Sequence, residues 1–437
     1  MQVGSVVRVH DVHQGNPKTG RRGVAPTKKP KAVHEMTSSK SLEYQERLAQ
    51  SGMMIGLGKR TRRAYGFDEI ALVPGSLTCD PEICDVSVKL GYHKLEIPII
   101  ASAMDSCVDV KMAIALGKLG SLGVLNLQGL QTRYENTEEA YAEIANSDKD
   151  SFVQLMQKLY TAPVQENLIA RRVEEIKNGG VLVSASVTPN WAEKYGPIAV
   201  EAGLSVLVVQ STVTGLEHKS ALGQPSLNLT KFTNKIGCPV IVGNCVTYQT
   251  CLELMETGLA GVLVGVGPGA ACTSRGVLGI GVPMATAIAD CAAARQTYAE
   301  KHGVAPIIIA DGGMSVGGDI CKAIACGADA AMIGSPFSRA QEAPGRGFHW
   351  GMATPSPVLP RGTRIKVGTS ASLAEILTGP ARTDDGSQNL VGALKTSMGT
   401  LGASNLAEMQ QVEVIIAPSI LTEGKVFQTA QQLGMGR

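Results

Sequence analysis

The sequence predicts a (β/α)8 barrel, or TIM barrel, of the α/β class, formed as a single catalytic domain. Two observations carry this prediction: short aliphatic runs recur along the chain, and helix-length segments separate them. A third is that small or polar residues stand where the runs end, as expected where strands open into loops. The runs cover residues 95–104, 121–127, 180–187, 204–212, 238–245, 261–267, 305–313 and 329–335.

The runs read as nearly continuous aliphatic stretches, which is typical of parallel strands that are buried on both faces. The segments between them are amphipathic, and several end in glycine, a common helix terminator; examples are residues 248–258 and 318–327. A doubly wound open sheet is the alternative. Its first turn usually carries a dinucleotide-binding glycine fingerprint, and the sequence contains none.

Composition narrows the class of protein. The chain has 437 residues, 44% of them hydrophobic, and a net charge of +2, so neither nucleic acid nor an anionic membrane is an expected partner. No apolar run approaches the roughly 20 residues that a membrane-spanning helix needs. The ten cysteines are scattered and form no CxxC pair, which argues against zinc and disulfides and favours a cytoplasmic enzyme.

The N-terminal residues 1–52 differ from the rest, since they are basic, rich in proline, glycine and serine, and lack apolar periodicity. We expect a disordered extension here, followed by the catalytic domain over residues 53–437. The extension reads as a leader without function, an organelle-targeting segment or a weak binding tail. It lacks the apolar core of a secretory signal.

Two predicted loops carry features of a phosphate site. Strands seven and eight end in ADGG (residues 310–313) and IGS (residues 333–335), and barrels commonly bind phosphate after these two strands. Glycines let the backbone approach an anion closely, and Asp311 is placed to accept hydrogen bonds from a ribose diol. The alternative is that these glycines only form tight turns.

Cys272 lies in GVGPGAACTSRG (residues 265–276), a glycine-rich loop that follows the sixth aliphatic run. A structural cysteine is normally buried in an apolar face, whereas this context favours exposure. Loop N–H groups and Arg275 would favour the thiolate, which makes Cys272 a candidate nucleophile. An inert loop cysteine is the alternative.

Residues 344–368 are rich in glycine, proline and arginine, and we expect a mobile loop over the barrel mouth. The polar residues of this loop that are candidates for the active site are His349, Arg361 and Arg364. An ordinary surface loop is the alternative.

Several motifs, in order along the chain, together resemble one enzyme family. They are YGFDEIALVPG (65–75), IPIIASAMDSCVD (97–109), VIVGNCVT (240–247), GPGAACTSRGVLGIGVP (267–283), IIADGGMSVGGDICKAIACGAD (308–329), MIGSPF (332–337), EAPGR (342–346) and LKTSMGTLGA (394–403). The chain from about residue 55 onward resembles the IMP dehydrogenase and GMP reductase family. It is most similar to the IMP-dehydrogenase-related branch of cyanobacteria and actinobacteria, which lacks the CBS regulatory module.

The resemblance implies a reaction and a set of residue roles. A cysteine thiolate attacks carbon two of a purine nucleotide, and hydride passes between that carbon and a nicotinamide cofactor. By resemblance Cys272 is the nucleophile, assisted by Thr273. The nucleotide would be held by Ser102, Met104, Asn244, Asp311, Gly313, Gly334, Ser335, Gly351 and Met352, and the cofactor NAD by Gln210, Ser211 and Gly265.

The sequence departs from the family pattern at several positions. Ala270 replaces a serine that contacts phosphate, and Gln210 replaces an aspartate that holds the cofactor ribose. About fifty residues predicted to be helical (130–179) stand where the family often inserts its regulatory module, so control through that module is not expected. In the dehydrogenases of the family, a long flap activates the water that attacks the intermediate. The corresponding segment of this chain is short, which leaves Arg361 and Thr273, with His349 behind them, as candidate bases.

A monovalent cation, K+, often binds the carbonyl groups of the cysteine loop in this family, and Gly267, Gly269 and Cys272 match those positions. A Glu-Gly-Gly run of a neighbouring subunit completes that site, and this chain has Glu423-Gly424-Lys425 instead. We therefore expect the Lys425 ammonium to replace the ion. The resemblance also implies a homotetramer or octamer.

The sequence thus predicts an NAD-dependent IMP dehydrogenase that converts IMP to XMP in guanine nucleotide biosynthesis. GMP reductase, which uses NADPH to convert GMP to IMP, is the main alternative. A purine-nucleotide-binding barrel without turnover is the third.

Overall fold

The structure is a computed structural model that describes residues 44, 46–47, 50, 52–148, 150–220, 226–351 and 363–434. Residues 48–437 group as one compact unit. The extension predicted over residues 1–52 falls almost wholly outside the described residues, so its disorder stays a prediction. Among the described helices, none is long and apolar enough to cross a membrane.

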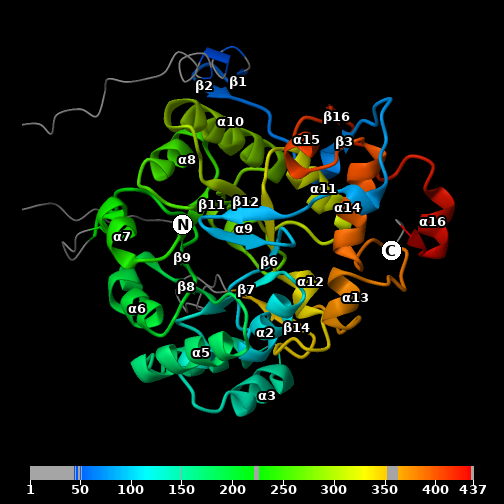
Figure 1. The fold of residues 1–437 in the computed structure, drawn as a ribbon. Coiled ribbons are helices and arrows are strands. Elements are labelled where there is room, and N and C mark those ends of the chain that lie inside the picture. The colour runs from blue at the N-terminus through cyan, green and yellow to red at the C-terminus, as the bar shows by residue number, and fades with distance from the viewer. Residues whose placement is uncertain are drawn as a thin grey trace, which may run out of the picture. The chain divides into compact units, whose positions relative to one another are not determined.

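Eight parallel strands close into a barrel, as the sequence predicts (Figure 1). They are β6 (Ile99–Ala101), β7 (Leu122–Asn126), β8 (Ser184–Val187), β9 (Val206–Gln210), β10 (Val240–Cys245), β11 (Gly261–Val264), β12 (Ile307–Asp311) and β13 (Ala330–Ile333). Each strand pairs with the next along the chain, and β13 closes on β6 with Met332 opposite Ile100. Each of the eight aliphatic runs supplies one strand.

The strands are aliphatic because both of their faces are covered. Every residue of β6, β7, β8, β10, β11 and β13 is buried. Strand spacing also explains Gly243 within β10, since a Cβ there would lie 2.5 Å from the Cβ of Leu263 on β11. A larger residue at this position would push the two strands apart.

A ring of helices surrounds the barrel in Figure 1. They include α2 (Val110–Lys118), α5 (Glu166–Asn178), α6 (Pro189–Glu201), α7 (Leu229–Ile236), α8 (Tyr248–Met255), α10 (Met284–His302), α11 (Gly317–Ala325) and α14 (Leu390–Thr400). The predicted terminators Gly258 and Gly327 follow α8 and α11 with φ of +82° and +110°. These left-handed conformations suit glycine and end the helices.

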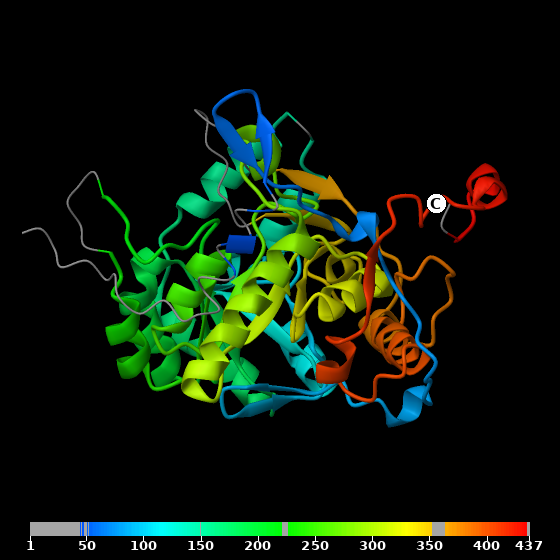
Figure 2. The ribbon, with the colours of Figure 1, turned by 90° about the horizontal axis from the view of Figure 1, so that it is seen from above.

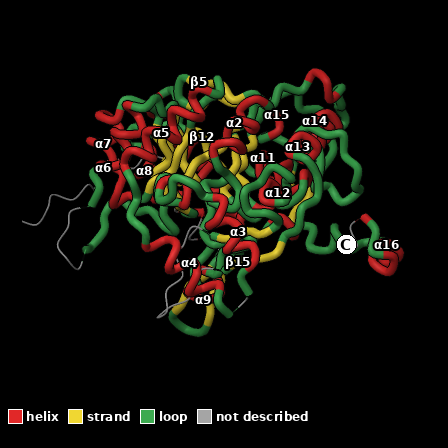
Figure 3. Tube along the Cα trace, turned by 90° about the horizontal axis from the view of Figure 1, so that it is seen from below, coloured by secondary structure: helices red, strands yellow, loops and turns green. Residues whose placement is uncertain are grey.

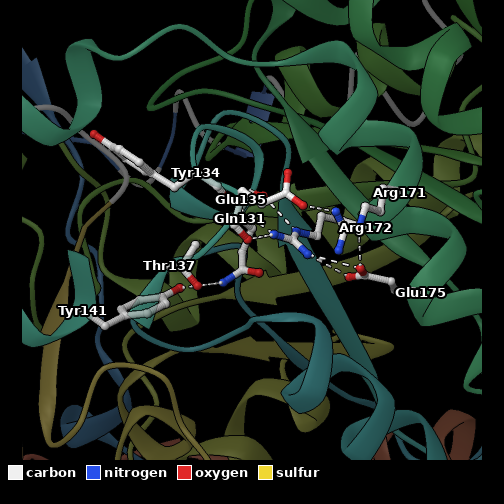
Figure 4. Close-up of polar contacts among 8 residues, drawn as sticks. All are labelled: Gln131, Tyr134, Glu135, Thr137, Tyr141, Arg171, Arg172 and Glu175. Atoms are coloured by element: carbon white, nitrogen blue, oxygen red, sulfur yellow. Dashed lines mark hydrogen bonds and ion pairs between the residues drawn. The ribbon is translucent and has the colours of Figure 1, made fainter. Parts of the chain in front are cut away.

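The connection between β7 and β8 is helical, as predicted. It contains η3 (Leu130–Thr132), α3 (Glu138–Asn146), α4 (Phe152–Thr161) and then α5, and its described residues form no CBS module. Figure 4 shows how Arg172 of α5 anchors this segment. Its guanidinium donates to the carbonyl oxygens of Gln131 (3.0 Å) and Glu135 (2.7 Å) and pairs with Glu175 (3.0 Å).

The remaining elements cover the two ends and one side of the barrel. In Figure 3, α3, α4, α9 (Ser274–Leu278) and β15 (Arg364–Lys366) lie at one end, and β5 (His93–Leu95), which pairs with β4 (Val88–Leu90), lies at the other. Figure 2 shows that the hairpin of β1 (Met53–Ile55) and β2 (Lys59–Thr61) and the C-terminal α16 (Val426–Gln431) extend outward. The smaller elements are η1 (Phe67–Glu69), β3 (Ile70–Leu72), η2 (Pro81–Ile83), α12 (Ser335–Ser338), β14 (Phe348–Trp350), α13 (Leu373–Leu377), α15 (Leu406–Met409) and β16 (Val414–Ile416).

Candidate active site

A cavity of about 690 Å³ opens at the carboxyl ends of the barrel strands. This is the end at which barrel enzymes place their chemistry. The cavity brings together most of the residues singled out from the sequence: Ser102, Met104, Gln210, Ser211, Asn244, Gly265, Gly267, Gly269, Cys272, Asp311, Gly313, Gly334, Ser335 and Gly351. The structure therefore gathers in one place residues that are up to 249 positions apart, from Ser102 to Gly351.

Cys272 lies on the loop between β11 and α9 and is exposed, as the glycine-rich context predicts. Its Sγ is 3.4 Å from Oγ of Ser274, and its N–H donates to the carbonyl oxygen of Gly269 at 2.9 Å. Arg275 donates to the carbonyl oxygens of Val266 (3.3 Å) and Val282 (2.9 Å). The guanidinium therefore braces the loop, a role that the sequence did not indicate.

Gly265 sets the direction of this loop. Its φ is +147°, and a Cβ there would lie 2.4 Å from the carbonyl oxygen of Asp311. Its N–H also donates to the carbonyl oxygen of Cys245 at the end of β10, at 3.0 Å. The loop that carries the thiol thus passes directly over two neighbouring strand ends, and only glycine fits at its first position.

Three side chains meet above strands β9, β10 and β12. Oδ2 of Asp311 accepts hydrogen bonds from Nδ2 of Asn244 (2.7 Å) and Nε2 of Gln210 (2.9 Å). Burial raises the pKa of the Asp311 carboxyl from 3.8 to about 6, and the two amide donors oppose that rise. The carboxyl is therefore largely ionised at neutral pH and able to accept from ligand hydroxyl groups.

The two predicted phosphate loops lie side by side. Gly312 and Gly313 have φ of +83° and +76°, and the Gly312 N–H donates to the carbonyl oxygen of Met332 at 2.9 Å. A Cβ on Gly313 would lie 2.9 Å from Cβ of Pro268, in the cysteine loop. The β12 turn thus packs against the loop that carries Cys272, in a conformation that favours glycine.

His349 is buried, although it lies in the segment predicted to be a mobile loop. Its Nδ1 lies 3.1 Å from Oγ of Ser106 and 2.8 Å from Oγ of Ser338. Burial lowers its pKa from 6.5 to about 4, so the imidazole is neutral at pH 7. A group this weakly basic is poorly suited to be a general base at neutral pH.

The prediction of a mobile loop over residues 344–368 is wrong for its two described ends. Strands β14 and β15 form an antiparallel pair, with His349 opposite Ile365. Arg364 is held at the C-terminal end of α3, where its guanidinium donates to the carbonyl oxygens of Ile144 and Ser147. Because it caps this helix end and does not line the cavity, Arg364 is not a site residue.

Other predicted residues fall outside the cavity wall or outside the description. Thr273 follows Cys272 and is partly buried, but it does not line the cavity. Lys425 precedes α16 and does not line it either, so its role as a replacement for potassium stays a prediction. Arg361 and Met352 lie outside the described residues.

Two cavity residues, Thr188 and Ser315, were not singled out from the sequence. Thr188 directly follows β8, so its place at a strand end was a usable signal. Ser315 lies beyond the predicted turn, and its N–H donates to Oδ2 of Asp319 at 2.9 Å, which no sequence pattern indicated.

A buried network behind the cavity was also missed. Oδ2 of Asp105 accepts from the hydroxyl of Tyr160 on α4 at 2.6 Å, and Oδ1 accepts from the N–H of Leu130 at 3.1 Å. Nε1 of Trp350 on β14 donates to the same Tyr160 hydroxyl at 3.1 Å. The network joins the loop after β6, the helical connection and the β14–β15 hairpin. Burial raises the pKa of Asp105 to about 6.

Three buried cysteines form the one group of metal-ligand type found among the described residues. The Sγ atoms of Cys245, Cys251 and Cys291 lie within 4.8 Å of one another. No described histidine, carboxylate or further cysteine joins this group. With three thiols in the apolar interior and no fourth side-chain ligand, the cluster differs from the four-ligand sites that hold structural zinc.

The comparisons with known proteins agree with this geometry. A family described as the IMP dehydrogenase / GMP reductase domain matches residues 64–353. The chain belongs to this family. An actinobacterial relative, an uncharacterized oxidoreductase from Mycolicibacterium smegmatis, is 39% identical over 371 residues, which cover 83% of this chain and 99% of the relative.

Two further family members extend the comparison. Inosine-5'-monophosphate dehydrogenase from Cryptosporidium parvum is 32% identical over 387 residues, covering 80% of this chain and 91% of that protein. A crystal structure of an IMP dehydrogenase/GMP reductase-like protein from Corynebacterium glutamicum superimposes with a TM-score of 0.80 at 34% identity, covering 85% and 99% of the two chains. Family membership supports an oxidoreductase built on a TIM barrel.

Proposed function

We propose that this family member is an NAD-dependent IMP dehydrogenase. The observation that carries the proposal is the shared cavity of Cys272, Asp311 and the two glycine turns. It provides a nucleophile, an acceptor for a ribose and backbone N–H groups for a phosphate, which are the needs of a purine nucleotide.

Each of these groups has a proposed role in the reaction. The Cys272 thiolate bonds to carbon two of the IMP base, while Asp311 accepts from the ribose hydroxyls and Gly313, Gly334 and Ser335 face the phosphate. When bound, NAD would supply the acceptor for the hydride that leaves carbon two. Water then displaces the sulfur, so IMP, NAD and water give XMP, NADH and a proton.

The base that activates this water is proposed to be Thr273 or Arg361. The depressed pKa of His349, about 4, makes the imidazole a weaker candidate. The cavity has the volume of ordinary ligand sites, which supports room for a nucleotide and the nicotinamide end of the cofactor. Gly267, Gly269 and Cys272 are proposed to offer carbonyl groups to K+ unless the Lys425 ammonium replaces it.

One observation favours GMP reductase as a second candidate. The connection between β14 and β15 is short, since these strands end at Trp350 and resume at Arg364. Such a short connection resembles that of the reductases, in which GMP and NADPH give IMP, ammonia and NADP. A nucleotide-binding barrel without turnover is the remaining candidate. We further propose a cytoplasmic homotetramer or octamer.

Paired assays separate the candidates. The purified chain is incubated with IMP and NAD, and separately with GMP and NADPH, while the absorbance of the reduced nicotinamide is followed. Formation of NADH in the first assay alone is the expected result. Consumption of NADPH in the second would replace the proposal with GMP reductase, and silence in both with tight nucleotide binding would support a barrel without turnover.

A further inference from the structure

Gln210 makes contacts that differ from those expected of a cofactor ligand. Its Nε2 lies 2.9 Å from Oδ2 of Asp311 and 3.1 Å from Oδ1 of Asn244. Asn244 in turn donates to the same Oδ2 at 2.7 Å. Both donor amides are thus directed at one oxygen of one carboxylate.

The barrel brings these three residues together. Gln210 ends β9 opposite Gly243 of β10, one residue before Asn244, and Asp311 ends β12. Strand β11 lies between β10 and β12 in the barrel order. The side chain of Gln210 therefore reaches across the mouth of the barrel, where a shorter side chain would fall short of Asp311.

The orientation of the glutamine amide is set by the carboxylate. Oε1 of Gln210 is buried and has no hydrogen-bond partner among the described residues. The opposite amide orientation would place Oε1 against the Asp311 oxygen, which is also an acceptor. Leaving a buried carbonyl oxygen unpartnered is unfavourable, so the observed orientation indicates that donation to Asp311 outweighs that cost.

The arrangement leaves one oxygen of Asp311 for a ligand. Both amide donors occupy Oδ2, and no described residue donates to Oδ1. Asp311 lines the cavity, so Oδ1 is available there to the vicinal hydroxyls of a ribose. A carboxylate fixed at one oxygen is pre-organised to accept at the other.

We propose that Gln210 is a positioning residue for the nucleotide side of the site, and that it acts through Asp311 rather than by binding the dinucleotide. This inference rests on the proposed function, because it takes Asp311 as the ribose acceptor. It assigns Gln210 to a different ligand than its family resemblance suggests. In the family pattern the residue at this position binds the cofactor ribose. In this chain that residue is Gln210, and it donates to the Asp311 carboxylate, which is proposed to bind the substrate.

The Gln210 donor affects how nucleotide binding depends on pH. Loss of the Gln210 donor leaves the Asp311 carboxylate less stabilised, so its pKa rises and it protonates at higher pH. The other titratable side chains lining the cavity are Cys272 and His349. His349 is neutral over the relevant range because burial lowers its pKa to about 4. A cavity-lining thiol titrates on the alkaline side. IMP affinity falls toward acid pH, a decline called here the acid limb, both because Asp311 protonates and because the IMP phosphate itself protonates in this range. The part of the acid limb that shifts between variants therefore reports on Asp311.

The test measures IMP affinity by calorimetry from about pH 5 to pH 8 for the wild type and Gln210→Leu, which keeps the side-chain bulk. We expect the dissociation constant for IMP at neutral pH to rise about tenfold, and the acid limb to move up by about one pH unit. The KM for NAD is expected to change by less than about twofold. Asp311→Asn should remove the part of the acid limb that Asp311 contributes and leave the part that comes from the IMP phosphate.

Two controls keep the result interpretable. Gln249→Leu removes an exposed glutamine of α8 whose Nε2 donates to Glu253 at 2.7 Å, and it should change none of these quantities. Thermal unfolding of Gln210→Leu checks that the barrel still folds. If it does not, Gln210→Glu replaces it, since a second carboxylate beside Asp311 should move the acid limb in the same direction.

Two outcomes would overturn the inference. One is a rise in the KM for NAD with IMP affinity and its acid limb intact, which would return Gln210 to the dinucleotide. The other is a variant that binds IMP as the wild type does at every pH. Failure of the wild type to bind IMP or GMP is a separate result, which would reject the proposed function itself.

Discussion

Tyr160→Phe is expected to destabilise the protein in a pH-dependent way. The hydroxyl donates to the buried Asp105 carboxyl at 2.6 Å and accepts from Nε1 of Trp350 at 3.1 Å. The substitution removes a charge-assisted hydrogen bond worth about 1.5–3 kcal/mol and leaves a buried indole N–H unpartnered, at about 1–3 kcal/mol. The expected loss in the free energy of unfolding is about 4 kcal/mol at pH 8.

The pKa of Asp105 sets the sign of the pH effect. Burial raises that pKa from 3.8 to about 6 in the folded protein. The folded state thus binds the proton more tightly than the unfolded state, so stability is full below about pH 4 and falls by about 3 kcal/mol as pH rises through 6. Without the Tyr160 donor the folded pKa rises further, which deepens this fall. At pH 5 the carboxyl is mostly protonated, and we expect the variant to lose only about 2 kcal/mol.

Urea unfolding of the wild type and variant at the two pH values measures both losses. Tyr134→Phe is the matched control, because its hydroxyl makes one hydrogen bond, to the carbonyl oxygen of Leu159 at 2.9 Å. It should cost about 1 kcal/mol at either pH. An equal loss for Tyr160→Phe at both pH values would refute the reasoning about Asp105.

Further predictions concern the site and its support. Cys272→Ala should lower kcat by about 10³-fold or more while the dissociation constant for IMP, measured by calorimetry, stays within about threefold; substantial residual turnover would remove covalent catalysis. Gly313→Ala forces a side chain into a φ of +76° and within 2.9 Å of Pro268, so IMP affinity should fall about tenfold with little effect on NAD. Lys425→Ala should make activity depend on added potassium, whereas a wild type already stimulated steeply by potassium would contradict the replacement. Arg172→Leu should lower the unfolding free energy by about 3 kcal/mol in urea, and a loss below about 1 kcal/mol would show that its carbonyl contacts are dispensable.

The fold was predictable because its signal is local. Each barrel strand is covered on both faces, so burial alone forces an aliphatic run, as in 206–209, and the runs can be counted. The proximity of the candidate residues was predictable for a related reason: the fold places every strand end at the same rim, so residues such as Asn244 and Asp311 meet there.

The contacts between distant side chains were not predictable. Nothing in the local sequence distinguishes Tyr160, which meets Asp105 across 55 positions, from Tyr141 on α3. Arg364 was a candidate because it lies in the segment expected over the barrel mouth, whereas its guanidinium donates to the carbonyl groups that end α3. Gln210 was recognised as unusual, but the sequence did not show that it reaches Asp311.

The exposure of Cys272 has a practical consequence for chemical probing. All ten cysteines are free, and Cys272 is the one that is exposed, while six of the others are buried and three are intermediate. A mild electrophile should therefore modify one position per chain first, because reaction at a thiol requires access. The extent of labelling would then count competent sites in a preparation, and a bound nucleotide would be detected as protection of that single thiol.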